Sequence, residues 1–330
     1  MTKLAMLKQL ARFLTAVLVA CTVTYTSTAI AQSSYPARPV RVIVPYAAGS
    51  ATDLTARRII AALSESMGQP FFVENIVGAV GIVGTERLVR SPGDGYTLAV
   101  TSSLHAILPA LHSLSFDAVK DIAPVALIGT SAMVLVVNPK FPAQNVRELI
   151  EMAKAKPEFV TFGSTGNGSV GHIAIEMLAG RSGAKFLHVP YKANAGLSTD
   201  LLGGQINAGF LGAAAAVQLI KSGQLRALGV STPTRSVALA DVPTLIESGI
   251  RGYDIDIWTM LIAPASTPPA VVARLREEAE RAMNQRSVMD YLREQSVGVP
   301  RLSPAALGEL LTRDIAKYSQ IVRDAGIKNE

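Results

Sequence analysis

Short apolar runs alternate with amphipathic segments between Met133 and Val230, and this alternation limits the folds that the chain can adopt. The apolar runs are typical of buried strands, and between them apolar residues recur at helical spacing. The expected strands are residues 133–137, 159–162, 185–189, 206–211 and 225–230, and the expected helices are 146–154, 170–179, 197–202 and 213–221. Strands that alternate with helices indicate a parallel sheet covered on both faces. Ligands of such sheets bind beyond the carboxyl ends of the strands.

The loop that follows the second of these strands carries the strongest functional pattern. It consists of Gly, Ser, Thr and Asn, and no acidic residue lies between Gly163 and His172. Ser169 precedes the next helix and is a natural N-cap. Free backbone N–H groups, hydroxyls and the positive end of a helix dipole therefore meet at one point, which favours an anion. We interpret this loop as a carboxylate-binding site made by Ser164, Thr165, Gly166, Asn167, Gly168 and Ser169.

Other interpretations of the same loop exist. Residues 166–171 fit the G-x-G-x-x-G dinucleotide fingerprint, but Lys192 follows the next strand where an acid would hold a ribose. Residues 167–171 nearly match the G-x-S-x-G nucleophile elbow, with Asn167 at the first Gly position. A P-loop is excluded because its lysine is missing. The loop could also be only a tight turn and a helix cap.

A second loop of the same type occurs near the start of the chain. Residues 40–44 are the first expected strand, and Ser50 and Asp53 have the S-x-x-D spacing of a helix cap. Asp53 is better explained as a cap because a carboxylate would repel an anion. The expected strand 96–100 also ends in a polar segment. The candidate ligand contacts in these two segments are Tyr46, Ala47, Ala48, Gly49, Ser50, Ser102 and Ser103.

Asn207, in the expected strand 206–211, completes the candidate site. Its amide could hydrogen-bond a ligand or satisfy a buried backbone group. Lys192 could attract an anion or lie on the surface as a solvated charge.

The first 31 residues have the composition of an export signal. Lys3, Lys8 and Arg12 precede an apolar stretch, and Ala29-Ile30-Ala31 fits a cleavage site that leaves Gln32 first. The segment Leu18-Val19-Ala20-Cys21 also resembles a bacterial lipobox, so lipidation of Cys21 is the alternative. Cys21 is the only cysteine, which excludes an intramolecular disulfide. We expect an exported, periplasmic protein.

Charge and length exclude some classes of partner. The net charge of +6 owes three positive charges to the signal segment; removing them leaves 28 basic residues against 25 acidic ones. Without a basic run, nucleic acid is not an expected partner. No residue pattern requires a cofactor, a metal ion or more than a monomer. A length of 330 residues suggests two domains. The helical tail after Thr267 has no new glycine loop, so we expect it to return to the first domain.

Several segments of this sequence resemble those of the periplasmic solute receptors of tripartite tricarboxylate transporters, the Bug family. The resemblance covers the whole mature chain. Its more specific segments are Pro45–Arg57, Val73-Glu74-Asn75, Gly163–His172, His188–Lys192, Asp200–Gln205, Arg226-Ala227-Leu228, Asp241–Thr244 and Gly252-Tyr253. The chain departs from the family pattern at Ser50, where a second Gly is usual, and at Asn207, where Asp is common. Loss of that Asp would change the pocket charge by one unit and would favour a more anionic ligand or one that lacks an ammonium group.

The resemblance implies a type II periplasmic-binding-protein-like α/β fold: two doubly wound domains joined by crossing hinge strands. We expect a signal peptide at residues 1–31, a first domain at 32–133 and 256–330, and a second at 134–255. In the family, the loops that match Tyr46–Ser50 and Ser164–Ser169 hold a ligand carboxylate through backbone N–H groups, hydroxyls and water.

The leading functional hypothesis is a non-enzymatic receptor. It would bind a small organic carboxylate between two domains, close about a hinge, and deliver the ligand to inner-membrane permease subunits. The main alternative is a secreted serine hydrolase in which Ser169 is activated by a histidine. The candidate histidines are His105, His112, His172 and His188. A signalling receptor with the same ligand would use the same residues.

Overall fold

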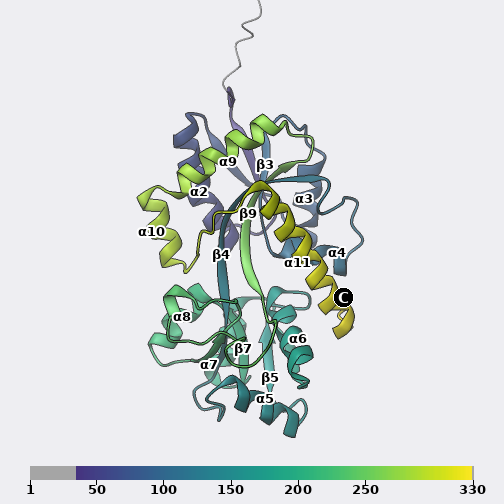
Figure 1. Cartoon of the computed structure of the whole chain (residues 1–330), viewed down its shortest axis with the longest axis vertical. Coiled ribbons are helices and arrows are strands. Elements are labelled where there is room, and N and C mark those ends of the chain that lie inside the picture. The colour runs from purple at the N-terminus through teal and green to yellow at the C-terminus, as the bar shows by residue number, and fades with distance from the viewer. Residues whose placement is uncertain (1–34, 329–330) are drawn as a thin grey trace, which may run out of the picture. The chain divides into compact units, whose positions relative to one another are not determined.

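Two long strands form the centre of the large compact unit of this chain. The computed structural model describes residues 35–328. Residues 35–38 belong to a separate N-terminal unit, and the large compact unit begins at Pro39. In this compact unit, strand β4 (Ile122–Val137) and strand β9 (Asp256–Pro264) are antiparallel, and their pairing runs from Ile122–Pro264 to Ala132–Asp256 (Figure 1). The remaining residues of β4 continue into a second group of strands, so β4 is shared by both groups.

The first group of strands has the order β2-β1-β3-β9-β4. Strands β1 (Val40–Val44), β2 (Phe71–Asn75) and β3 (Thr97–Ser102) are parallel, whereas β3 pairs with β9 in the antiparallel sense. The helices before β4 are α2 (Ala51–Met67), η1 (Ala79–Gly81), α3 (Ile82–Val89) and α4 (Leu104–Leu111). Those after β9 are α9 (Pro269–Met283), α10 (Arg286–Glu294) and α11 (Pro304–Ala325).

The second group has the order β4-β7-β5-β6, with β8 on the other side of β4. Strands β5 (Thr161–Ser164), β6 (Leu187–Pro190) and β7 (Ala208–Gly212) are parallel. Both β7 and β8 (Arg226–Val230) are antiparallel to β4. The helices of this group are α5 (Val146–Ala155), α6 (Val170–Ser182), α7 (Asn194–Gly203), α8 (Ala213–Lys221) and η2 (Val237–Leu239).

The expected parallel sheet is thus confirmed only in part. The strands joined through helices are parallel, as the alternation predicted, but β4, β8 and β9 are not. The strand expected at residues 133–137 is the second half of a strand of 16 residues. It runs from one group of strands to the other, so it pairs with different neighbours along its length, and local alternation carries no information about that pairing.

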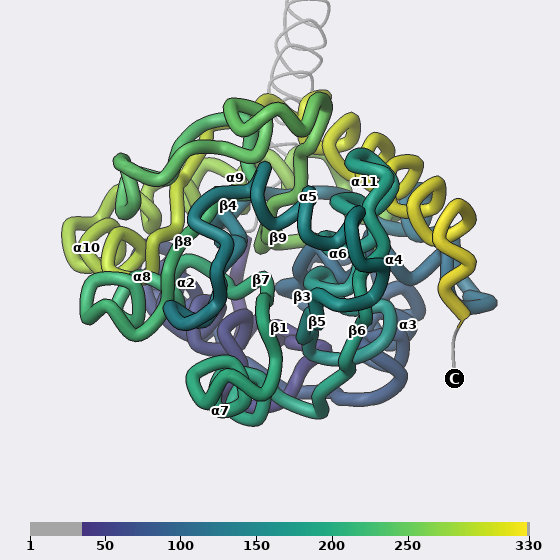
Figure 2. The backbone as a smooth tube through the Cα atoms, turned by 90° about the horizontal axis from the view of Figure 1, so that it is seen from below, coloured from purple at the N-terminus to yellow at the C-terminus, as the bar shows by residue number. Residues whose placement is uncertain are grey.

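Helix α11 contacts both groups of helices. It packs on α4 and on α6 and lies along both in Figure 2.

Asp314 of α11 is fully buried and accepts a hydrogen bond from Trp258 Nε1 of β9 at 2.9 Å, while Lys317 Nζ lies 3.1 Å from the other carboxylate oxygen. Asp256, at the start of β9, lies in the same cluster, and its Oδ1 has no partner among residues 35–328. Burial raises the pKa of Asp256 to about 6, with Asp314 and Asp254 adding to the shift and Lys317 and Arg313 opposing it.

The predicted signal segment and Cys21 lie outside the described residues. Within residues 35–328 there is no helix with the length and apolarity to span a bilayer. The predicted division into two domains stays a prediction.

Candidate functional site

The first loop of the candidate site connects β1 to α2. Ser50 caps the helix: its Oγ accepts the N–H of Asp53 at 3.3 Å. The backbone φ of Gly49 is +80°, which favours glycine, whereas that of Ser50 is −64°. The departure from the family pattern at Ser50 therefore introduces no backbone strain. Ala47, Ala48 and Gly49 are exposed.

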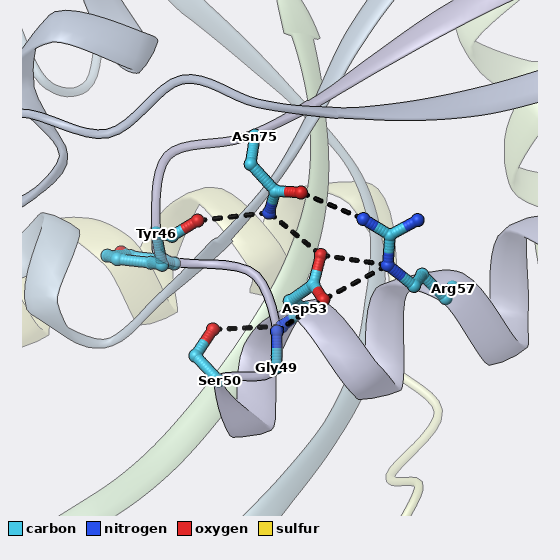
Figure 3. A network of polar contacts seen from close by, with 6 residues as sticks. All are labelled: Tyr46, Gly49, Ser50, Asp53, Arg57 and Asn75. Atoms are coloured by element: carbon cyan, nitrogen blue, oxygen red, sulfur yellow. Dashed lines mark hydrogen bonds and ion pairs between the residues drawn. The ribbon is translucent and has the colours of Figure 1, made fainter.

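A buried carboxylate fixes the shape of this loop (Figure 3). Asp53 is 1% exposed and accepts hydrogen bonds from Gly49 N at 2.9 Å, Asn75 Nδ2 at 2.8 Å and Arg57 Nε at 3.0 Å. Asn75 also donates to the carbonyl of Tyr46 at 3.0 Å. Burial alone would raise the pKa of Asp53, but these hydrogen bonds and the charge of Arg57 hold it below its ordinary value. Asp53 is thus fully engaged in structural contacts, in agreement with its interpretation as a cap.

Tyr46 connects the first loop to the end of β3. Its hydroxyl accepts hydrogen bonds from Ser102 Oγ at 2.9 Å and from Ser102 N at 3.3 Å, and lies 3.2 Å from Thr101 Oγ1. Burial raises the pKa of Tyr46, with the hydrogen bonds from Ser102 and Thr101 opposing it, so the phenol is neutral near pH 7. The Ser102 hydroxyl therefore has a protein partner. Ser103 is fully buried, and its Oγ has no partner among residues 35–328.

The second loop connects β5 to α6. Ser169 caps α6 by accepting the N–H of His172 at 3.2 Å. Two glycines turn the chain with positive φ, +112° at Gly166 and +70° at Gly168. Ser164 Oγ accepts the N–H of Gly166 at 3.2 Å. Thr165 and Asn167 are exposed, whereas Ser164 is buried.

The two loops lie at strand ends that point toward each other. On β9, Thr259 pairs with Ser102 at the end of β3. On β4, Met133 pairs with Gly212 at the end of β7, and the neighbouring pair involves Asp256. The two strand ends are therefore separated by about three residues of β9, or roughly 10 Å. Since β1 lies beside β3 and β5 beside β7, the two loops belong to these facing ends.

One contact directly joins the two sides. A Cβ built on Gly168 would lie 2.3 Å from Leu111 Cδ1, at the end of α4. The loop after β5 therefore touches the helix that follows β3. Leu111 was not expected at the site, because an apolar residue at a helix end has no distinguishing pattern in the sequence.

Asn207 is the one candidate that the structure separates from the others. It lies at the amino end of β7, and its Oδ1 accepts hydrogen bonds from Thr161 N at 2.8 Å and Thr161 Oγ1 at 2.9 Å. Thr161 begins β5, three residues before Ser164. The amide therefore satisfies a strand start at the opposite end of the sheet. The expected effect of this position on the pocket charge stays a prediction, and the contact with Thr161 does not support it.

The arrangement offers donors for an anion. The first two amides of each helix, Ala51 and Thr52 in α2 and Val170 and Gly171 in α6, have no acceptor within their helix. The amides of Thr165 and Asn167 likewise have no acceptor among residues 35–328. No acidic residue lies in either loop, and Asp53 is already paired. The amides of Ala51 and Thr52 were missed as candidates, although their position after the Ser50 cap could have identified them.

The described part of the chain contains no cluster of three or more His, Cys, Asp or Glu residues that could hold a metal ion.

The hydrolase alternative required a hydrogen bond between Ser169 and a histidine ring. Instead, Ser169 Oγ accepts the backbone N–H of His172. The ring of His188 contacts Ser164, and His105 Nε2 lies 2.8 Å from the carbonyl of Ala118.

Comparison with known proteins assigns the family. Residues 55–327 match the model of the tripartite tricarboxylate transporter family receptor. The chain belongs to this family. It is 33% identical to Protein BugT of Bordetella pertussis over 302 residues, which cover 91% of this chain and 93% of BugT. The family consists of periplasmic solute-binding receptors of a transporter, so this receptor is not an enzyme.

Solved structures of relatives share the fold. The periplasmic binding protein BugD is 28% identical, with a TM-score of 0.75 over 90% of this chain and 100% of BugD. MatC of Rhodopseudomonas palustris, solved with bound malate, is 29% identical, with a TM-score of 0.75 over 87% of this chain and 100% of MatC. A second R. palustris protein, solved with adipate, is 30% identical, with a TM-score of 0.77 over 89% of this chain and 99% of that one. The predicted α/β binding-protein fold with crossing strands is confirmed.

Proposed function

We propose that this receptor binds a small organic carboxylate between the loop ends of β1 and β3 on one side and of β5 and β7 on the other. The observation that carries the proposal is that two helix N-termini, those of α2 and α6, lie at facing strand ends and that the loops before them contain no acidic residue. The malate and adipate bound by two relatives belong to the same chemical class.

The proposed contacts come from both loops. The backbone N–H groups that have no acceptor in their own loop or helix would hold carboxylate oxygens, with the hydroxyls of Ser50, Thr165 and Ser169 as further partners. These amides are those of Ala51, Thr52, Thr165, Asn167, Val170 and Gly171. Ser102 and Ser103, at the end of β3, would support the first loop without touching the ligand. The Ser102 hydroxyl is bound to Tyr46 of that loop. Asn207 has no part in the proposed site.

Ligand capture would close the two proposed domains, 32–133 with 256–330 and 134–255, about the strands β4 and β9. The closed form would then be recognised by permease subunits in the inner membrane. The proposal includes export through cleavage after Ala31 and a monomeric receptor.

A thermal-shift screen of residues 32–330 against mono-, di- and tricarboxylates tests the proposal. A ligand at about 100 times its Kd stabilises a protein by about 2.7 kcal/mol, which gives a measurable rise in Tm. We expect the shift to be confined to one class of carboxylate. The absence of a shift with every acid in the panel, at millimolar concentration, would refute carboxylate binding.

A further inference from the structure

Two histidine rings stack behind the second loop. His172 lies in the first turn of α6 and is 7% exposed, and His188 lies in β6. Their ring centroids are 3.8 Å apart with an interplanar angle of 10°. Neither ring is among the proposed carboxylate contacts.

Each ring bonds a different part of the loop. His188 Nε2 lies 2.7 Å from Ser164 Oγ. His172 Nδ1 accepts the backbone N–H of Gly168 at 3.2 Å. Because an amide N–H can only donate, Nδ1 of His172 carries a lone pair, and the proton of the neutral ring is on Nε2. That atom lies 3.6 Å from Glu176 Oε1, which favours the same tautomer.

These bonds determine which amides of the loop are used internally. The N–H of Gly168 is bound to His172, and the N–H of Gly166 is bound to Ser164 Oγ, which His188 contacts in turn. The amides between and before them, those of Thr165 and Asn167, have no acceptor among residues 35–328. The amides of Gly166 and Gly168 are therefore held by the histidine pair and Ser164, whereas those of Thr165 and Asn167 remain available to an anion.

The His188 ring is neutral near pH 7. Burial lowers the pKa of His188 to about 4; the neighbouring His172 adds to this shift and Glu176 opposes it. A neutral ring can form a hydrogen bond with Ser164 without placing a full positive charge behind the loop.

We infer that His172 and His188 are positioning residues of the anion site. The stacked pair holds the loop in the one conformation that leaves the Thr165 and Asn167 amides free for a carboxylate. The inference rests on the proposed function, since it concerns the same loop.

Asn and Gln variants separate the hydrogen bonds from the stacking. The Oδ1 of asparagine can take the position of histidine Nδ1, and the terminal group of glutamine can take that of Nε2. His172→Asn and His188→Gln are therefore matched variants that keep the bond to the loop. His172→Gln and His188→Asn are crossed variants that lose it. All four variants lose the ring stack, so the difference within each pair reports the hydrogen bond alone.

The affinities of wild type and the four variants for malate and adipate would be measured by titration calorimetry. We expect crossed variants to bind about 5- to 30-fold more weakly than their matched partners, which corresponds to about 1–2 kcal/mol. Hydrogen exchange of the Gly168 amide would be measured without ligand by NMR. His172→Gln should exchange faster at this amide than His172→Asn, while the Tm values of the two stay similar.

The inference is overturned if wild type binds an acid and crossed and matched variants bind it equally well. It is also overturned if the Gly168 amide exchanges at the same rate in both His172 variants. Failure of the proposed function has a different result: wild type binds neither these two acids nor any other carboxylate of the panel, whatever the exchange rates are.

Discussion

Replacement of Asp256 by Asn should stabilise the protein at alkaline pH. Asp256 Oδ1 is buried without a partner in the described part of the chain, next to the buried carboxylate of Asp314. Ionisation of Asp256 therefore adds a further negative charge beside Asp314 and Asp254, where Lys317 already pairs with Asp314. The amide has nearly the same shape and carries no charge.

The size of the effect follows from the pKa. Burial raises the pKa of Asp256 from 3.8 to about 6. At about 1.4 kcal/mol for each pH unit, ionisation in the folded state costs up to about 3 kcal/mol. Between pH 4 and 6 the folded protein binds more protons at this site than the unfolded chain, so the free energy of unfolding falls as pH rises. Above the folded pKa the full cost is present. We expect Asp256→Asn to gain about 1–3 kcal/mol at pH 8 and nothing below pH 4.

Urea unfolding at pH 4, 6 and 8, followed by circular dichroism, measures this difference. Asp290→Asn is the control, because the Asp290 carboxylate is 48% exposed, lies 3.2 Å from Arg293 Nη1 and is not among the charges that act on Asp256. Such a pair contributes about 0–1 kcal/mol, so this variant should gain no stability at pH 8. A loss of stability in Asp256→Asn at pH 8 would refute the reasoning, since the ionised carboxylate would then be stabilised by Lys317 or Arg313.

Three further predictions concern the loops. Asp53→Asn should lose about 2–3 kcal/mol of unfolding free energy at pH 7, because its NH2 would face donors from Gly49, Asn75 and Arg57. Since the pKa of Asp53 is lowered, this stabilisation is present above about pH 4 and is lost as pH falls through the folded pKa. Urea unfolding of wild type and variant at pH 7 and at a pH below the folded pKa measures this; equal stability of the two proteins at pH 7 would contradict a role for the network. Gly168→Ala should weaken carboxylate binding about tenfold, through its positive φ and the clash with Leu111; adding Leu111→Ala should restore part of the affinity in calorimetry, and strict additivity would contradict the contact. Carboxylate affinity should change by less than about threefold between 50 and 500 mM NaCl, because backbone amides carry the site; a steeper loss in calorimetry would implicate the exposed Lys192.

Local patterns predicted much of the site. Ser50 and Ser169 are followed by helical apolar spacing, and both cap their helices as expected. Caps and amphipathic faces depend on neighbours within a few residues, so a single sequence contains the information. The same holds for the strand Val40–Val44 and the helix Ala213–Lys221, whose observed bounds equal the predicted ones.

Properties that depend on distant pairing could not be predicted in this way. The amide of Asn207 was equally consistent with ligand binding and with capping a strand, and only its register with Thr161 decides between them. The histidine stack requires that β6 lie beside β5, so that His188 meets a residue of α6. The antiparallel direction of β4 and β9 likewise depends on a partner more than a hundred residues away in the chain.

The position of β9 between β3 and β4 has a consequence for the order in which the protein can fold. Every other strand of the described chain has been synthesised once Val230 is reached, and β4 can then already pair with β7 and β8. The edges of β3 and of the first half of β4 stay open until Pro264 emerges. Closure of this gap requires contacts between segments far apart in the chain, and pairings of this kind form slowly. A nascent chain that stops before β9 would expose two unpaired strand edges, the feature that recruits chaperones or starts aggregation.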